Sequence, residues 1–197
     1  MAASELGPWE PLDLESVVEV FAPADFRWWI SGGRALDLHL GRTWRSHEDT
    51  DVGVVRRDLG SLYALLSGWD LHVAAAGRLT PWHGEPLAVD RHQNNVWCRL
   101  ALDRPWALDV TIGEGSDDAW VYRRDPSVRL PWALAVLRTA DGVPYLSPEL
   151  QLLYKSKGLR PKDDVDAAQV IPHLDDRQRD LLSRLVEPDH PWQRLLS

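Results

Sequence analysis

Two aspartates, Asp49 and Asp51, stand one residue apart where a β-rich segment, TDVGVV, begins. Side chains alternate along a β-strand, so residues i and i+2 lie on one face, and we expect both carboxylates to point the same way. Two carboxylates held together repel each other, and a bound cation or protonation of one carboxyl relieves the repulsion. Oxygen ligands suit Mg²⁺, which keeps several waters and takes further ligands from substrate phosphates. The pair therefore predicts a magnesium site.

A glycine turn, Ser31-Gly32-Gly33, lies one short helix before the two aspartates. Glycine lets the backbone approach a ligand closely, and the N–H groups at the start of the following helix favour an anion. Ser31 adds a hydroxyl donor. Neither the P-loop pattern GxxxxGK[ST] nor the dinucleotide pattern GxGxxG is present. A Gly-Gly turn alone is most often structural, but next to the D-x-D pattern it predicts a phosphate site.

A third carboxylate, Asp109, lies in the later segment ALDVTIG. Leu108, Val110 and Ile112 form one apolar face of this expected strand, so Asp109 and Thr111 face the other way. A single aspartate among β-forming residues is disfavoured by propensity, which indicates a specific role. We expect Asp109 to complete the metal site, and the alternative is an exposed residue on an edge strand.

These groups must be positioned by strands that alternate with helices. Hydrophobic periodicity and turn residues predict helices over 12–21, 34–40 and 59–68, strands over 27–31, 50–55, 69–75, 94–102 and 106–113, a loop over 77–93 and a hairpin over 119–131. The remaining chain predicts helices over 147–159, 162–171 and 175–186, the first with Pro148 at its first position. The order of elements indicates an α+β fold over residues 1–146, in which helices flank a mixed β-sheet, with a helical region over 147–197 packed on it.

Composition and charge limit the classes of function. The chain has 197 residues and a formal net charge of −8, which disfavours nucleic acid as a partner and suits a cationic partner or a metal. Its single cysteine, Cys98, excludes an intrachain disulfide and makes the cytoplasm the default location. The first residues have neither the basic region nor the apolar core of a secretory signal, and no apolar run is long enough to span a bilayer, so we expect no membrane partner.

The segment SGGRALDLHLGRTWRSHEDTDVGV resembles the signature of the DNA-polymerase-β-like nucleotidyltransferase superfamily: a Gly-Gly or Gly-Ser turn, a D-x-D pair and a third aspartate on a later strand. Its longer pattern is similar to the branch that contains aminoglycoside 2″-nucleotidyltransferases and lincosamide nucleotidyltransferases. The matching residues are Gly32, Gly33, Ala35, Leu36, Asp37, Leu40, Gly41, Arg42, Arg45, His47, Asp49 and Asp51. The LDV at 108–110 matches the family's third-carboxylate strand, and PELQLLYKSKGLRPKDDVDAAQVIPHL is similar to the family's helical C-terminal segment.

The resemblance implies a nucleotidyltransferase fold, with ATP or another NTP as co-substrate and Mg²⁺ as cofactor. It implies that Asp49, Asp51 and Asp109 hold Mg²⁺ against the nucleotide phosphates, and that Asp109 also acts as the base on the acceptor hydroxyl. The other implied nucleotide-binding residues are Ser31, Gly32, Gly33, Arg42, Arg45, His47, Lys155 and Lys157. Residues i and i+2 of a helix point apart, so at most one of the two lysines is expected to reach the phosphates.

The resulting hypothesis is an enzyme that transfers a nucleoside monophosphate, AMP from ATP, to a hydroxyl of a small molecule and releases pyrophosphate. An aminoglycoside-like acceptor is favoured because it is polycationic and the chain is acidic. Glu114, Asp117 and Asp118 are either a binding site for the acceptor's ammonium groups or a solvated turn. Two alternatives remain: a nucleotidyltransferase that modifies a protein, as in toxin–antitoxin systems, and a non-catalytic nucleotide-binding protein of the same fold. The sequence leaves the acceptor, the base preference and the oligomeric state open.

Overall fold

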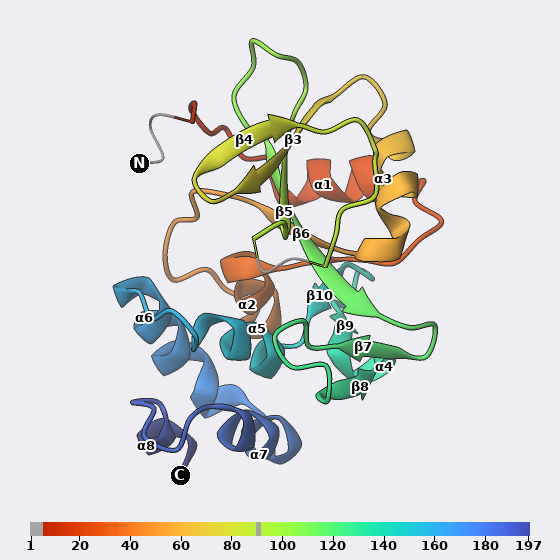
Figure 1. The fold of residues 1–197 in the computed structure, drawn as a ribbon. Coiled ribbons are helices and arrows are strands. Elements are labelled where there is room, and N and C mark those ends of the chain that lie inside the picture. The colour runs from red at the N-terminus through yellow and green to blue at the C-terminus, as the bar shows by residue number, and fades with distance from the viewer. Residues whose placement is uncertain (1–5, 90–91) are drawn as a thin grey trace.

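The computed structural model of the chain describes residues 6–89 and 92–197 (Figure 1). Parts of two expectations lie outside the described residues: the loop over 77–93 includes residues 90 and 91, and the segment inspected for a secretory signal includes residues 1–5. Among the described residues, no helix is long and apolar enough to cross a membrane.

A mixed β-sheet forms the centre of the molecule and confirms the expected α+β class (Figure 1). Its strands are β1 (Trp28–Ile30), β2 (Asp51–Val55), β3 (Asp70–Ala75), β4 (Arg78–Pro81), β5 (Asn95–Arg99), β6 (Leu108–Gly115), β7 (Ala119–Val121), β8 (Arg129–Pro131), β9 (Val136–Arg138) and β10 (Pro144–Leu146). Their order is β4-β3-β5-β6-β2-β1-β10-β9, and β7 and β8 extend from β6 as the expected hairpin. β2 and β6 run parallel as neighbours, while β1 pairs antiparallel with β2 and parallel with β10.

Helices cover the sheet and form the end of the molecule away from β3 and β4 (Figure 1). The α-helices are α1 (Leu14–Phe21), α2 (Gly32–Leu40), α3 (Leu59–Leu65), α4 (Trp132–Ala135), α5 (Pro148–Lys155), α6 (Pro161–Val170), α7 (Asp176–Leu185) and α8 (Gln193–Leu196), and two short 3₁₀ helices are η2 (Arg56–Asp58) and η3 (Ile171–His173). α1 begins at the cap Asp13, whose carboxylate accepts a hydrogen bond from the Ser16 N–H. α2 ends at Gly41, whose positive φ of 64° closes the helix in a left-handed cap.

Two hydrophobic clusters hold these layers together. One joins Val52 and Val54 of β2 to Val17 and Phe21 of α1, as the alternation along TDVGVV predicts. The other includes Trp29 of β1 and continues through α2 into the C-terminal helices. Fully burying one such large apolar side chain contributes about 1.5–3 kcal/mol. The division at residue 146 stays a prediction, and the second cluster spans that position.

Several short elements differ from the expectations. β4 lies inside the expected loop over 77–93, and β9, β10 and α4 were not predicted. β4 is mostly exposed and pairs only with β3, while β9 and β10 are three residues long. Elements this short contain too few residues to show a period of two or of 3.6, so tertiary pairing decides their structure.

Candidate active site

The predicted acidic residues meet at the N-terminal ends of β2 and β6. Asp51 is the first residue of β2 and stands directly beside Asp109 in the parallel ladder. The ladder continues one residue earlier, because the Asp109 N–H donates to the Thr50 carbonyl at 3.0 Å. Asp49 lies just before the strand rather than within it, so strand alternation does not set its direction. All three carboxylates nevertheless line one cavity of about 500 Å³.

Asp109 is held in place by two donors from β5. Asn95 Nδ2 donates to its Oδ1 at 2.8 Å, and Trp97 Nε1 donates to its Oδ2 at 3.3 Å. Burial raises the pKa of Asp109 from 3.8 to about 7, although the bond from Asn95 opposes the rise. Burial, and then the negative charges of Asp109 and Asp49, also raise the pKa of Asp51 well above its usual value. Negative charge is thus concentrated at this point of the cavity, which favours a bound cation.

The three aspartates fit Mg²⁺ by the chemistry of their oxygen donors, but they do not form a finished metal cage. Within residues 6–89 and 92–197, no group of three acidic, histidine or cysteine side chains is arranged to hold a metal ion by itself. Mg²⁺ takes one or two carboxylates, several waters and substrate phosphate oxygens, so three protein ligands are not required in advance. The metal role of Asp49, Asp51 and Asp109 therefore stays a prediction.

The glycine turn is the first turn of α2, and its glycines make room for neighbouring side chains. Gly32 has a φ of +66°, and a β-carbon there would overlap Oδ2 of Asp51. A β-carbon at Gly33 would overlap His47 and Arg45. The Gly32 N–H donates to Oε1 of Gln151 at 2.8 Å, so this amide is already bonded, in contrast to the expected phosphate contact. Gly32 and Gly33 line the cavity.

Ser31 occupies the cap position before α2 but does not line the cavity. Its N–H donates to the Asp51 carbonyl at 2.9 Å, its side chain makes no capping bond, and the residue is buried. The helix begins at Gly32, two residues earlier than predicted, so Ser31 directly precedes it as the cap residue. The structure therefore gives Ser31 a backbone role beside the acidic pair.

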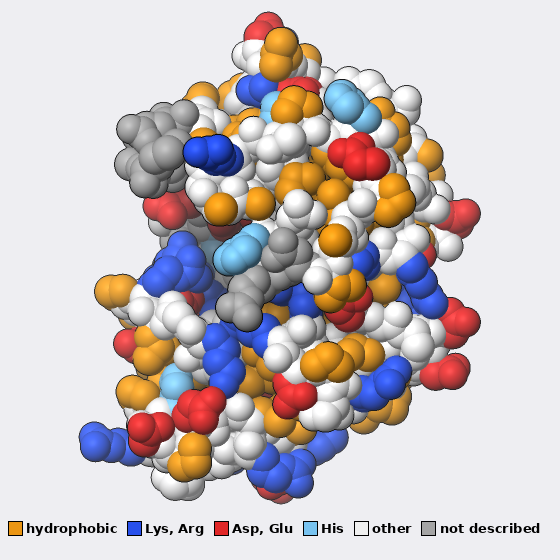
Figure 2. Space-filling model, in the orientation of Figure 1, with side chains coloured by type: hydrophobic (Ala, Val, Ile, Leu, Met, Phe, Trp, Pro, Cys, Tyr) orange, Lys and Arg blue, Asp and Glu red, His pale blue; other side chains and the backbone are white. Residues whose placement is uncertain are grey.

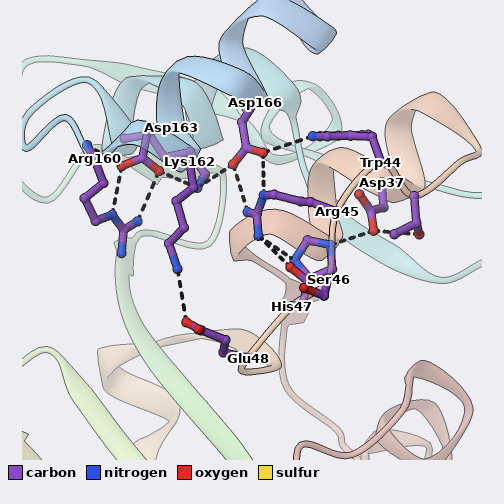
Figure 3. A network of polar contacts seen from close by, with 12 residues as sticks. Asp37, Trp44, Arg45, Ser46, His47, Glu48, Arg160, Lys162, Asp163 and Asp166 are labelled. Carbon is purple, nitrogen blue, oxygen red and sulfur yellow. Dashed lines mark hydrogen bonds and ion pairs between the residues drawn. The ribbon is translucent and has the colours of Figure 1, made fainter.

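A buried carboxylate of α6, Asp166, binds side chains from two other parts of the chain, the segment before β2 and α5 (Figure 3). Its side chain is 0% exposed. Arg45 binds it through two bonds, Nε to Oδ1 at 2.7 Å and Nη2 to Oδ2 at 2.9 Å. Lys155 Nζ lies 3.0 Å from Oδ2, and Trp44 Nε1 donates to Oδ1 at 3.2 Å. Asp166 therefore fixes Arg45 and Lys155, both of which line the cavity.

Asp163, one turn earlier on α6, binds the other side of Lys155 at 2.8 Å. It also accepts two bonds from Arg160, Nε to Oδ2 at 2.8 Å and Nη2 to Oδ1 at 3.1 Å. Burial opposes ionisation of this carboxyl, yet the bonds from Arg160 and Lys155 lower its pKa from 3.8 to about 2. Asp163 is thus ionised at neutral pH, and it balances the charge of two basic residues that line the cavity.

Besides Ser31, three further predicted nucleotide-binding residues do not line the cavity in the structure. Arg42 bonds Oε1 of Gln169 at 2.7 Å. His47 Nε2 lies 2.7 Å from Oδ2 of Asp37, and burial lowers its pKa. Lys157 reaches outward to Glu187 at 2.9 Å. Of the two lysines, only Lys155 is among the residues that line the cavity, and its contact with phosphate stays a prediction.

The acidic turn proposed for acceptor binding is paired with arginines and does not line the cavity. Glu114 accepts from Arg56 Nε at 2.6 Å, and Asp117 lies 2.6 Å from Nη1 of Arg57. These two carboxylates are thereby balanced by neighbouring arginines, and Asp118 is exposed. These contacts favour the solvated-turn interpretation over binding of ammonium groups.

Other residues line the cavity that the sequence did not single out, and most of the charged ones are basic. Figure 2 shows Lys and Arg side chains around the hollow between the sheet and the C-terminal helices. The additional lining residues include Asn95, Trp120, Arg123, Arg124, Gln151, Tyr154, Arg160 and Lys162. The adjacent arginines 123 and 124, in the middle of a hairpin, were the sequence signal that could have drawn attention to that wall.

Comparisons with known proteins show that the mixed sheet and its flanking helices have the fold of solved nucleotidyltransferase structures. A family model described as aminoglycoside-2″-adenylyltransferase matches residues 13–80, which include the glycine turn and the D-x-D pair. Among curated protein sequences there is no significant match.

Solved structures of that kind share the fold. The match to the crystal structure of ANT(2″)-Ia in complex with adenylyl-2″-tobramycin covers 87% of this chain and 94% of that chain, with 17% identity and a TM-score of 0.58. The lincomycin-bound structure of the lincosamide antibiotic adenylyltransferase LnuA covers 82% and 98%, with 16% identity and a TM-score of 0.54. The solution structure of the antibiotic-resistance factor ANT(2″)-Ia covers 86% of each chain, with 18% identity and a TM-score of 0.56. The resemblance to this branch of nucleotidyltransferases is confirmed.

Proposed function

We propose that the protein transfers AMP from ATP to a hydroxyl group of a small antibiotic-like molecule and releases pyrophosphate. The observation that carries this proposal is the placement of Asp51 beside Asp109 at the edge of a cavity that Asp49 also lines. The match to an adenylyltransferase family over residues 13–80 supports adenylyl transfer. An aminoglycoside is the first acceptor to test, because one similar structure contains adenylyl-2″-tobramycin.

In this proposal, Asp49, Asp51 and Asp109 hold Mg²⁺, which neutralises the phosphate charge and aligns the attacking oxygen when it is bound. Asp109, oriented by Asn95 and Trp97, accepts the proton of the acceptor hydroxyl. The acceptor oxygen then forms a bond to the α-phosphorus, and the bond from that phosphorus to pyrophosphate breaks. Arg45 and Lys155 stabilise the negative charge of the transferring group.

Calorimetry with ATP and Mg²⁺ tests the nucleotide site, and transfer of labelled AMP to a panel of aminoglycosides, lincosamides and purified proteins tests the reaction. The proposal expects label on an antibiotic, with pyrophosphate release that depends on that antibiotic. Label on a polypeptide alone, or binding of ATP without any turnover, contradicts it.

Replacement of one carboxylate tests the acidic site itself. Asp49→Asn removes a charge without changing the size of the side chain, and we expect it to abolish transfer while circular dichroism stays unchanged. Turnover at the wild-type rate in this variant would show that the metal assignment is wrong.

A further inference from the structure

The cavity has two basic walls, which differ in whether their cations are paired with carboxylates. On the α5–α6 wall, each basic side chain of the network already has a carboxylate partner: Arg45 with Asp166, Lys155 with Asp163 and Asp166, and Arg160 with Asp163. These positive charges are balanced before any ligand arrives. The other wall is the β7–β8 hairpin, which presents Arg123 and Arg124.

Arg123 is the unbalanced cation of that second wall. No described residue forms an ion pair or side-chain hydrogen bond with its guanidinium, and its Nε is buried without an acceptor. Burial lowers its pKa, and the charges of Arg124 and Arg56 act in the same direction, while Tyr154 and Glu114 oppose the shift. Its neighbour Arg124 differs, because that side chain is exposed and donates to the Tyr154 carbonyl at 2.8 Å. A half-buried, unpaired cation is unfavourable by itself and is stabilised by an anionic ligand.

Arg123 and the acidic site face the same cavity. Arg123 lies in the turn after β7, two residues beyond Val121, which pairs with Glu114 of β6. Its side chain lines the cavity that Asp49, Asp51 and Asp109 also line. An extended triphosphate that starts at the aspartates, together with the reach of an arginine side chain, can therefore meet Arg123 within this cavity.

The surroundings of Arg123 favour phosphate over the acceptor. The guanidinium lies 6.0 Å from the ring centre of Tyr154, and the nearby carboxylate of Glu114 is already paired with Arg56. A polycationic acceptor would be repelled by Arg123 and Arg124. The terminal phosphates of a nucleotide carry several negative charges, and the leaving pyrophosphate carries them away from the acidic site.

We propose that Arg123 binds the terminal phosphates of the nucleoside triphosphate and the pyrophosphate that leaves, and this inference rests on the proposed nucleotidyl transfer. A second phosphate-binding wall thus lies opposite α6, on a hairpin distant in sequence from the D-x-D pair. Arg123 makes its contact only when nucleotide is present, which explains why it has no partner in the protein alone.

Calorimetry with Mg²⁺ and three probes, ATP, inorganic pyrophosphate and AMP, tests this assignment without any acceptor. We expect Arg123→Gln to raise the dissociation constants of ATP and pyrophosphate about 10-fold to 100-fold, as for loss of a charged hydrogen bond, and to leave that of AMP unchanged. For Arg123→Lys, we expect dissociation constants of ATP and pyrophosphate between those of Arg123→Gln and the wild type. Arg129→Gln is the matched control, since Arg129 is exposed on β8 of the same hairpin and does not line the cavity.

Thermal unfolding separates a binding role from a structural one. Without ligand, Arg123→Gln should melt at or above the wild-type temperature, because it removes an unpaired charge from a half-buried position. A lower melting temperature with a proportionate loss of AMP binding would assign Arg123 to structure and overturn the proposal. Wild-type affinity of Arg123→Gln for ATP and pyrophosphate would also overturn it, as would an effect only on the KM of the acceptor. If the wild type binds neither ATP nor pyrophosphate, the proposed function itself fails.

Discussion

Gly32 and Asp51 are complementary in space: the carboxylate of Asp51 occupies the position that a β-carbon of residue 32 would take. The contact joins the first residue of α2 to the first residue of β2. The glycine of the turn is therefore required by the aspartate as well as by its own positive φ. This relationship links the two patterns that the sequence presents separately.

Gly32→Ala should abolish transfer and lower the melting temperature, because the new methyl group must displace Asp51. Gly41→Ala is the matched control, since Gly41 has a similar φ of +64° but nothing within 4 Å of its β-carbon position. We expect Gly41→Ala to cost about 1–2 kcal/mol from backbone strain alone and to keep most of its activity. Transfer assays and thermal melts of both variants measure the difference. Equal activity of the two alanine variants would argue against a specific contact between Gly32 and Asp51.

Asp51→Asn should stabilise the protein in the absence of metal and nucleotide. The change removes the repulsion of Asp51 by Asp109 and Asp49 and the unfavourable burial of a charge. The same variant should lose the additional stabilisation that Mg²⁺ and ATP give to the wild type. Differential scanning fluorimetry with and without MgATP measures both effects, and Asp103→Asn in an exposed turn serves as the control. A lower melting temperature of ligand-free Asp51→Asn is the result that contradicts this prediction.

Asp166→Asn should destabilise the fold by about 3–5 kcal/mol, because it leaves Arg45 and Lys155 partly buried beside a neutral partner. Asp180→Asn, which breaks the exposed pair with Arg184 on α7, should change the free energy of unfolding by less than about 1 kcal/mol. Urea denaturation at pH 7 gives both values. If the two variants lose similar amounts of unfolding free energy, the buried network contributes no more to stability than a surface ion pair.

Asp163 gives stability a defined dependence on pH. Its pKa is about 2 in the folded protein and 3.8 when unperturbed, so the unfolded chain binds the proton first as the pH falls. The stabilisation from this group, about 2 kcal/mol, is complete above pH 5 and is lost as the pH falls through 4 towards 2. Urea denaturation in steps from pH 6 to pH 2.5 measures how steeply the free energy of unfolding changes with pH. Asp163→Asn should be less stable at pH 6 and show a shallower slope, and an unchanged slope would refute the assignment.

The sequence was sufficient for the parts of the site that depend on local pattern. Asp49 and Asp51 are neighbours in the chain, and the apolar face of Leu108, Val110 and Ile112 left Asp109 as the polar exception. The expected alternation is seen in β6, where these three apolar residues are buried. The main strands and helices followed from the same periodic patterns.

Other parts of the site depend on packing that local pattern does not encode. In the segment KDDVDAAQV, Asp163 and Asp166 are indistinguishable from solvated charges until α6 is placed against α5 and the loop that carries Arg45. Arg42, His47 and Lys157 match the family pattern by position, yet Gln169, Asp37 and Glu187 hold them outside the cavity. The role inferred for Arg123 requires the packing that brings the turn after β7 to the cavity, far in sequence from the D-x-D pair.

The bond from the Gly32 N–H to Gln151 has a consequence for how the molecule can be divided. Gln151 belongs to α5, so the turn that accommodates the acidic pair is completed by a residue from the C-terminal third of the chain. The hydrophobic cluster shared by β1, α2 and the last helices ties the same two parts together. A fragment cut before α5 would therefore expose apolar surface and leave its glycine turn without the bond from Gln151, so we expect the part of the chain that carries the acidic pair not to fold as an independent unit.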